Sequence, residues 1–190
     1  LQRLLSRIRA TGPITVADFM SEALAGARDG YYRSGDPLGV AGDFTTAPEI
    51  SQMFGELIGA WLAERWQAMG SPARAMLVEL GPGRGSLMAD ALRATRRVEG
   101  FHAAIELHLV EINDTLRARQ RQSLQAIAPA LQPDWHAGFA DLPDSELPLL
   151  LVANEFFDAL PIRQLQRTAR SWHERLIDAE GGALRFVLAP

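Results

Sequence analysis

The sequence predicts an α/β fold over residues 73–190, preceded by a helical segment over residues 1–72. From residue 75 onward, short apolar segments that are typical of buried strands alternate with segments of helical periodicity. A glycine-rich turn joins the first of these strands to the first helix, and the residues before 72 lack strand-like segments. The alternation predicts a parallel sheet with right-handed crossover connections.

The helical segment is expected to contain two helices around a loop. Thr15 and Asp18 have the spacing of a capping box, which predicts a helix up to about residue 27. Residues 30–42 contain four glycines and a proline and are expected to form a loop. Pro48 is well placed to begin a long helix, along which seven apolar residues form one stripe. These residues are Ile50, Met53, Phe54, Leu57, Ile58, Trp61 and Leu62.

Four strands and two connecting helices are expected in the α/β part. The strands cover residues 75–80, 105–112, the neighbourhood of Trp135, and 149–153, and the helices cover 86–97 and 114–127. The end of the chain differs, because residues 172–177 and 184–188 flank two glycines and predict an antiparallel hairpin.

Composition excludes several classes of function. The chain of 190 residues has no cysteine, which excludes disulfides, thiolate metal sites and cysteine nucleophiles. A formal net charge of -4 argues against nucleic acid as the main partner. No apolar run is long enough to span a membrane, so a cytoplasmic protein is expected. No metal is expected, because the histidines lack metal-ligand spacing (His102, His108, His136 and His173).

The sharpest local signal is the glycine loop, Gly81, Gly83 and Gly85, directly after the strand at 75–80. Glycines at this G-x-G-x-G spacing let a ligand approach the backbone, and the helix start offers unpaired N–H groups. The dinucleotide fingerprint G-x-G-x-x-G fails at Ser86, and the lysine of a phosphate-binding NTPase loop is absent. A turn selected only for its backbone geometry is the alternative interpretation.

Two acidic residues flank the glycine loop in the expected sheet. Glu111 ends the second strand, where a carboxylate can accept hydrogen bonds from both hydroxyls of a ribose; a solvated glutamate is the alternative. Glu79 lies inside an apolar strand and needs a partner, because burying an unpaired carboxylate is costly. A ligand ammonium group and the N–H groups of the loop are equally suitable partners.

Three stretches together resemble a known family. Residues 77–86 are similar to the first motif of class I methyltransferases. Residues 42–56 (GDFTTAPEISQMFGE) and 153–161 (ANEFFDALP) resemble the two signature stretches of the MidA-like family of these enzymes. That family includes bacterial proteins and the mitochondrial methyltransferase that serves respiratory complex I assembly. The resemblance spans the chain from about Pro13 to Leu176.

The resemblance implies a Rossmann-like class I methyltransferase sheet that binds S-adenosylmethionine. It also implies methyl transfer to a protein arginine, of a complex I subunit in the mitochondrial branch, and a matrix location if the source is eukaryotic. The chain starts with Leu1 and ends in a strand-like segment, which suggests a fragment. Family members are longer, so the resemblance implies that the C-terminal part is missing. The alternatives are a non-catalytic, cofactor-binding assembly factor and an NAD-dependent oxidoreductase.

The expected site residues fall in separate segments after the strands. Asn154, Glu155 and Asp158 follow the fourth strand and are the expected catalytic residues, because a guanidinium acceptor needs carboxylates to orient it; a turn cap is the alternative for Asp158. Phe139 and Asp141 follow the third strand and are placed for adenine, although an ordinary loop is as good an interpretation. The full set expected to bind the cofactor is Glu79, Gly81, Gly83, Gly85, Glu111, Phe139, Asp141, and the lid or helix-cap residues Thr45 and Thr46.

Overall fold

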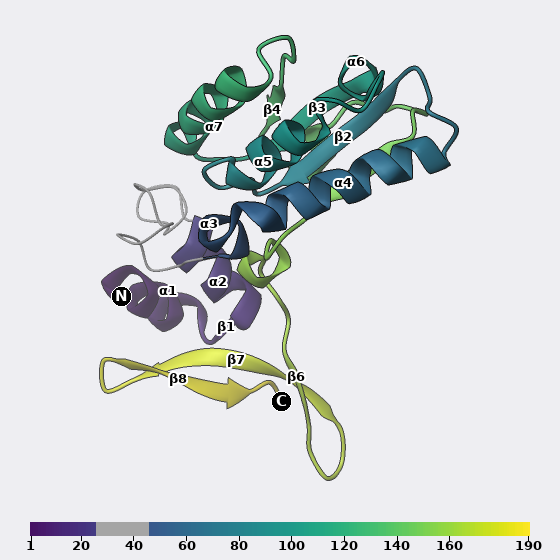
Figure 1. Ribbon diagram of the computed structural model, residues 1–190. Coiled ribbons are helices and arrows are strands. Elements are labelled where there is room, and N and C mark those ends of the chain that lie inside the picture. Colours follow the sequence, from purple (N-terminus) through teal and green to yellow (C-terminus); the bar gives the residue numbers. More distant parts are fainter. Residues whose placement is uncertain (26–45) are drawn as a thin grey trace. The chain divides into compact units, whose positions relative to one another are not determined.

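The computed structural model describes residues 1–25 and 46–190, which form two compact units (Figure 1). The first unit combines the N-terminal residues with residues 158–190, and the second unit ends at Phe157. This division differs from the boundary near residue 72 that we expect from the sequence. The reason is that both ends of the chain contribute strands to one sheet.

A four-stranded parallel sheet forms the centre of the second unit, in the order β4-β3-β2-β5. Its strands are β2 (Ala75–Leu80), β3 (Ile105–Val110), β4 (Asp134–His136) and β5 (Leu149–Val152). Every residue of β2 is buried, as is usual for a central strand of a parallel sheet that helices cover. The predicted α/β class with a parallel sheet is therefore confirmed.

Five helices accompany this sheet in the described part of the unit: α3 (Ala47–Ile50), α4 (Gln52–Ala68), α5 (Ser86–Thr95), α6 (Phe101–Ala104) and α7 (Asp114–Ile127). Two 3-10 turns, Phe139–Asp141 and Phe157–Ala159, follow β4 and β5. The main core joins helices to strands through Trp66 of α4, Leu92 of α5, Phe101 of α6 and Leu109 of β3, all at most 3% exposed. Figure 1 shows α4 and α5 side by side against the sheet.

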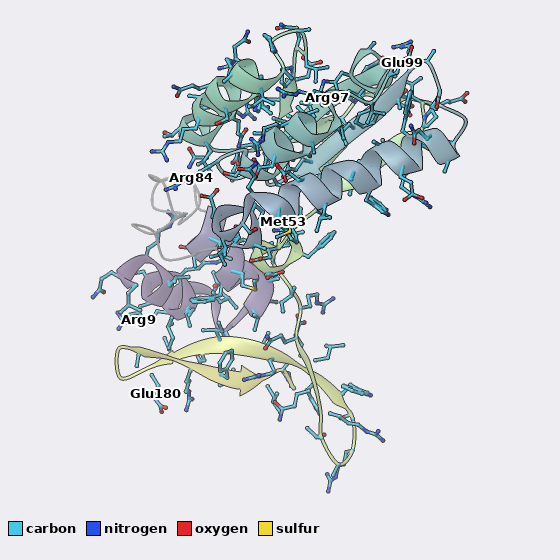
Figure 2. All side chains as sticks on the ribbon, viewed as in Figure 1. Arg9, Met53, Arg84, Arg97, Glu99 and Glu180 are labelled. Carbon is cyan, nitrogen blue, oxygen red and sulfur yellow. The ribbon has the colours of Figure 1, made fainter. Side chains whose placement is uncertain are left out.

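Glycines, rather than the apolar stripe, form the face of α4 that contacts α5. A Cβ atom on Gly59 would lie 2.5 Å from the Ala91 carbonyl oxygen, and one on Gly55 would lie 2.6 Å from the Asp90 Cβ. The expected stripe is therefore only partly right. Of its seven members only Leu62 is buried, and four are exposed (Ile50, Met53, Leu57 and Trp61; Met53 is labelled in Figure 2). Hydrophobic periodicity could not find a contact face made by residues without side chains.

The long helix also begins later than Pro48 predicts. Pro48 lies in the short α3, and Ser51, with φ -144° and ψ 118°, breaks the helix before α4 begins. By contrast, α7 has the predicted bounds. Its Asn113 cap accepts hydrogen bonds from the backbone N–H groups of Thr115 and Leu116 at 2.9 and 3.3 Å.

The first unit contains an antiparallel sheet built from both ends of the chain. Its central strand β7 (Trp172–Glu180) pairs with β1 (Ile14–Thr15), β6 (Leu165–Arg167) and β8 (Ala183–Leu188). The predicted C-terminal hairpin is thus confirmed as β7 and β8. Arg7 links helix α1 (Gln2–Thr11) to helix α2 (Val16–Ala25) through two ion pairs. Its guanidinium group lies 2.9 Å from the Asp18 carboxylate and 3.2 Å from the Glu22 carboxylate. Among the described residues, no helix is both long and apolar enough to cross a bilayer.

Candidate functional site

The carboxyl ends of β2, β3 and β5 meet at one edge of the parallel sheet. Strand pairing places Leu80 beside Val110 and Glu79 beside Val152. The N–H of Gly81 extends this pairing by donating to the Val110 carbonyl at 2.9 Å. The segments that follow these three strands are therefore neighbours, at the edge where ligands bind in open α/β sheets.

The backbone of the glycine loop requires its glycines. Gly81, Gly83 and Gly85 have φ values of 63°, 56° and 83°, in the left-handed region that side chains disfavour. A Cβ atom on Gly81 would lie 2.7 Å from Cδ2 of Phe156, which comes from the segment after β5. The loop therefore needs glycine both for its backbone conformation and, at Gly81, for the room that Phe156 occupies.

Glu79 carries a carboxyl group that is buried within β2. It is 3% exposed, and among the described residues none makes a hydrogen bond to its Oε2. Burial raises the pKa of Glu79 to about 8, so the group is mostly protonated at neutral pH. Of the two partners expected for it, the described loop N–H groups do not reach Oε2. A ligand cation, the other expected partner, stays a prediction.

Glu111 is also buried, but it is held by hydrogen bonds. Its Oε1 accepts from the backbone N–H of Asn113 at 2.9 Å, and its Oε2 accepts from Nε2 of Gln120 at 3.3 Å. Burial raises the pKa of Glu111, and these hydrogen bonds oppose that increase. The carboxyl group is therefore fixed at the end of β3, beside the glycine loop, and its ribose role stays a prediction.

Gln120 is a residue that we did not single out in the sequence. It lies on α7 between Leu116 and Leu124, one helical turn from each, and all three are buried. A polar residue on the apolar face of a helix was the signal that could have revealed it. Its hydrogen bonds connect Glu111 to the glycine loop.

Glu49 of the 42–56 stretch braces the other end of the glycine loop. Its Oε1 accepts a hydrogen bond from Ser86 Oγ at 2.6 Å, and its Oε2 lies 3.6 Å from Nη1 of Arg84. The two expected threonines are less informative. Thr46 is half-buried at the N-cap of α3 without a side-chain capping hydrogen bond, and Thr45 lies outside the described residues.

The 153–161 stretch reaches the loop through its first residues. Asn154 and Phe156 are half-buried, and Glu155 is exposed with a φ of 50°. A positive φ is uncommon outside glycine, and such conformations gather at functional sites. Asp158 is exposed and is the first residue of the chain's return to the first unit, and its catalytic role stays a prediction.

The remaining expected residues lie on an exposed turn. Phe139, 58% exposed, and Asp141 belong to the 3-10 turn that follows β4. Their assignment to adenine stays a prediction. Within residues 1–25 and 46–190, no three side chains of metal-ligating type come together.

Comparison with known proteins agrees with this geometry. The model of a family described as "Putative S-adenosyl-L-methionine-dependent methyltransferase" matches residues 57–190. "Protein arginine methyltransferase NDUFAF7, mitochondrial" is 41% identical in Mus musculus, over 100% of this chain and 48% of that protein. The Danio rerio protein of the same name is also 41% identical, over 100% of this chain and 50% of its own. The chain thus spans about half the length of these relatives.

A solved structure extends the similarity to the fold and the ligand. It is a COG1565 superfamily member from Burkholderia thailandensis bound to S-adenosyl-homocysteine, the form of the cofactor that remains after methyl transfer. This protein is 30% identical, with a TM-score of 0.83 over 100% of this chain and 49% of its own. The family match and this neighbour confirm the predicted cofactor class. The chain belongs to this family of S-adenosyl-L-methionine-dependent methyltransferases.

Proposed function

We propose that the protein transfers a methyl group from S-adenosylmethionine to an arginine of a protein acceptor. The observation that carries the proposal is the sheet edge where the left-handed glycine loop and the buried Glu79 and Glu111 meet. Within the described part of the chain, Oε2 of Glu79 has no hydrogen-bond partner. The names of the mouse and zebrafish relatives support the arginine acceptor. The resemblance to the complex I assembly branch supports a respiratory complex I subunit as that acceptor.

Different residues of the chain bind different parts of the cofactor. The backbone of the glycine loop receives the amino-acid part of the cofactor, Glu79 faces its ammonium group, and Glu111 accepts from the ribose hydroxyls. Phe139 and Asp141 contact adenine, and Thr46 lies over the cofactor. When bound, the cofactor supplies a sulfonium methyl group that a nucleophile can displace.

The segment after β5 binds the methyl acceptor. Asn154 and Glu155 orient the guanidinium group toward the methyl carbon, and positioning of this kind accounts for much of a displacement rate. The mitochondrial names of the relatives support the matrix as the location if the source is eukaryotic, and the cytoplasm is the counterpart in a bacterium.

The test is a binding and transfer assay on the natural protein. Calorimetry with S-adenosylmethionine and with NAD should show binding of the first only. Labelled S-adenosylmethionine with a cell lysate should then give a methylated arginine, identified by mass spectrometry. Binding without transfer would favour the non-catalytic assembly factor, and preference for NAD would refute the proposal.

Glu111→Ala is expected to weaken S-adenosylmethionine binding by about 1–3 kcal/mol, because charge-assisted hydrogen bonds to the ribose are lost. Glu111→Gln should lose less, because one acceptor oxygen remains. Calorimetry on the three proteins checks this. Equal affinities would remove Glu111 from the ribose site.

Glu155→Gln is expected to cut methyl transfer at least about tenfold while S-adenosylmethionine affinity barely changes, because the carboxylate acts on the acceptor. Turnover with purified acceptor, measured beside cofactor titration, separates the two effects. Asp158→Asn is the control and should lose less. A parallel loss of affinity and turnover would instead place Glu155 against the cofactor.

A further inference from the structure

The Gln120 side chain has a partner for each of its hydrogen-bonding atoms although it is fully buried, at 0% exposure. Its Nε2 donates to the Gly83 carbonyl at 2.6 Å and to Glu111 Oε2 at 3.3 Å. Its Oε1 accepts from Nε1 of Trp135 at 2.8 Å. A primary amide has two N–H donors, so each acceptor receives one.

These three partners come from different elements of the sheet edge. Gly83 lies in the loop after β2, Glu111 follows β3, and Trp135 is in β4. The aliphatic part of Gln120 also supports the loop, because a Cβ atom on Gly85 would lie 3.2 Å from its Cα and Cγ. One side chain thus contacts the loop at two glycines and fixes the carboxylate beside it.

We propose that Gln120 is a positioning residue that holds the glycine loop and the Glu111 carboxylate at a fixed separation, and thereby shapes the site for the ribose and amino-acid parts of S-adenosylmethionine. This inference rests on the proposed function, since it concerns how the cofactor site is held. Gln120 acts through Gly83 and Glu111 and is not itself a catalytic residue.

Packing alone does not explain an amide at this position. Leu116 and Leu124 fill the same face of α7, and a third apolar residue would avoid the cost of burying a polar group. The Gly83 carbonyl and the Glu111 carboxylate are both acceptors, and they repel each other in a buried setting. The Nε2 group lies within hydrogen-bond distance of both and converts this repulsion into two attractive contacts.

The experiment compares Gln120→Met with Gln122→Met, a matched change at an exposed glutamine on the same helix. Calorimetry on the natural protein should show S-adenosylmethionine affinity falling roughly 10- to 100-fold for Gln120→Met. Gln122→Met should bind as the wild type does. Urea unfolding of the ligand-free variants measures stability separately.

A double-mutant cycle with Glu111→Ala distinguishes positioning from general support. In that background Gln120→Met should cost no more than about fivefold, because one of its acceptors is already gone. Equal fold losses in both backgrounds, or unchanged affinity of Gln120→Met, would overturn the inference. Failure of the wild type to bind would refute the proposed function instead.

Trp135→Phe provides a second variant if Gln120→Met does not fold. It keeps a ring at this position but removes the N–H that holds Gln120 Oε1, so the amide can turn away from its two acceptors. Its affinity should fall in the same direction and by less. Affinity equal to that of the wild type would overturn the inference.

Discussion

Gly83→Val is expected to abolish measurable binding of S-adenosylmethionine, with an affinity loss greater than about 100-fold. Gly83 has a φ of 56°, and a β-branched side chain disfavours this region. The valine would also lie in the loop whose backbone we propose receives the amino-acid part of the cofactor. Calorimetry measures the loss, and circular dichroism shows whether the fold is kept.

The matched control for this change is Gly70→Val. Gly70 also has a positive φ, of 87°, but nothing lies within 4 Å of a Cβ atom placed on it. The control therefore carries the backbone strain without filling a binding space, and it should bind the cofactor normally. If Gly83→Val bound the cofactor as the control does, the loop would not be the cofactor site.

Glu79→Gln is expected to flatten the pH dependence of stability of the ligand-free protein. The pKa of Glu79 rises from 4.5 to about 8 in the folded protein because of burial. The folded state therefore holds this proton more tightly than the unfolded state, and the free energy of unfolding falls as pH rises from about 4.5 to 8. The contribution lost over this window is about 3–5 kcal/mol.

Urea unfolding of the ligand-free wild type and Glu79→Gln at pH 5, 6.5 and 8 measures this effect. Glu111, whose pKa is also raised by burial, leaves a smaller slope of the same sign in the variant. Glu79→Gln should be the more stable protein at pH 8. Identical slopes in the two proteins would contradict the assignment of a buried, proton-holding Glu79.

Elements with a local signal could be predicted from the sequence. Apart from Glu79, every residue of β2 is apolar, as is typical of a strand buried on both faces. Helix α7 has the Asn113 cap and a clear helical periodicity of apolar residues. The strand β1, which is only two residues long, could not be predicted. These residues form a strand because they pair with β7 at the other end of the chain, and no local sequence pattern predicts that pairing.

The candidate site likewise contains residues that a local sequence pattern marks and residues that it does not. The glycines at 81, 83 and 85 and the acid at 111 could be found because spacing and strand position mark them. Gln120 could not be found by spacing, because its contacts to Gly83 and Glu111 exist only after strands and helix pack together. The brace between Glu49 and Ser86 likewise joins residues from two distant stretches.

The sheet of the first unit has a consequence for the order in which the protein is made. A ribosome synthesises the chain from the N-terminus at roughly 5–20 residues per second. The four described strands of the parallel sheet all precede β7, so they have been synthesised while β1 still has no β7 to pair with. The strands of the binding edge can therefore pair during translation, whereas β1 pairs only after β7 has left the ribosome.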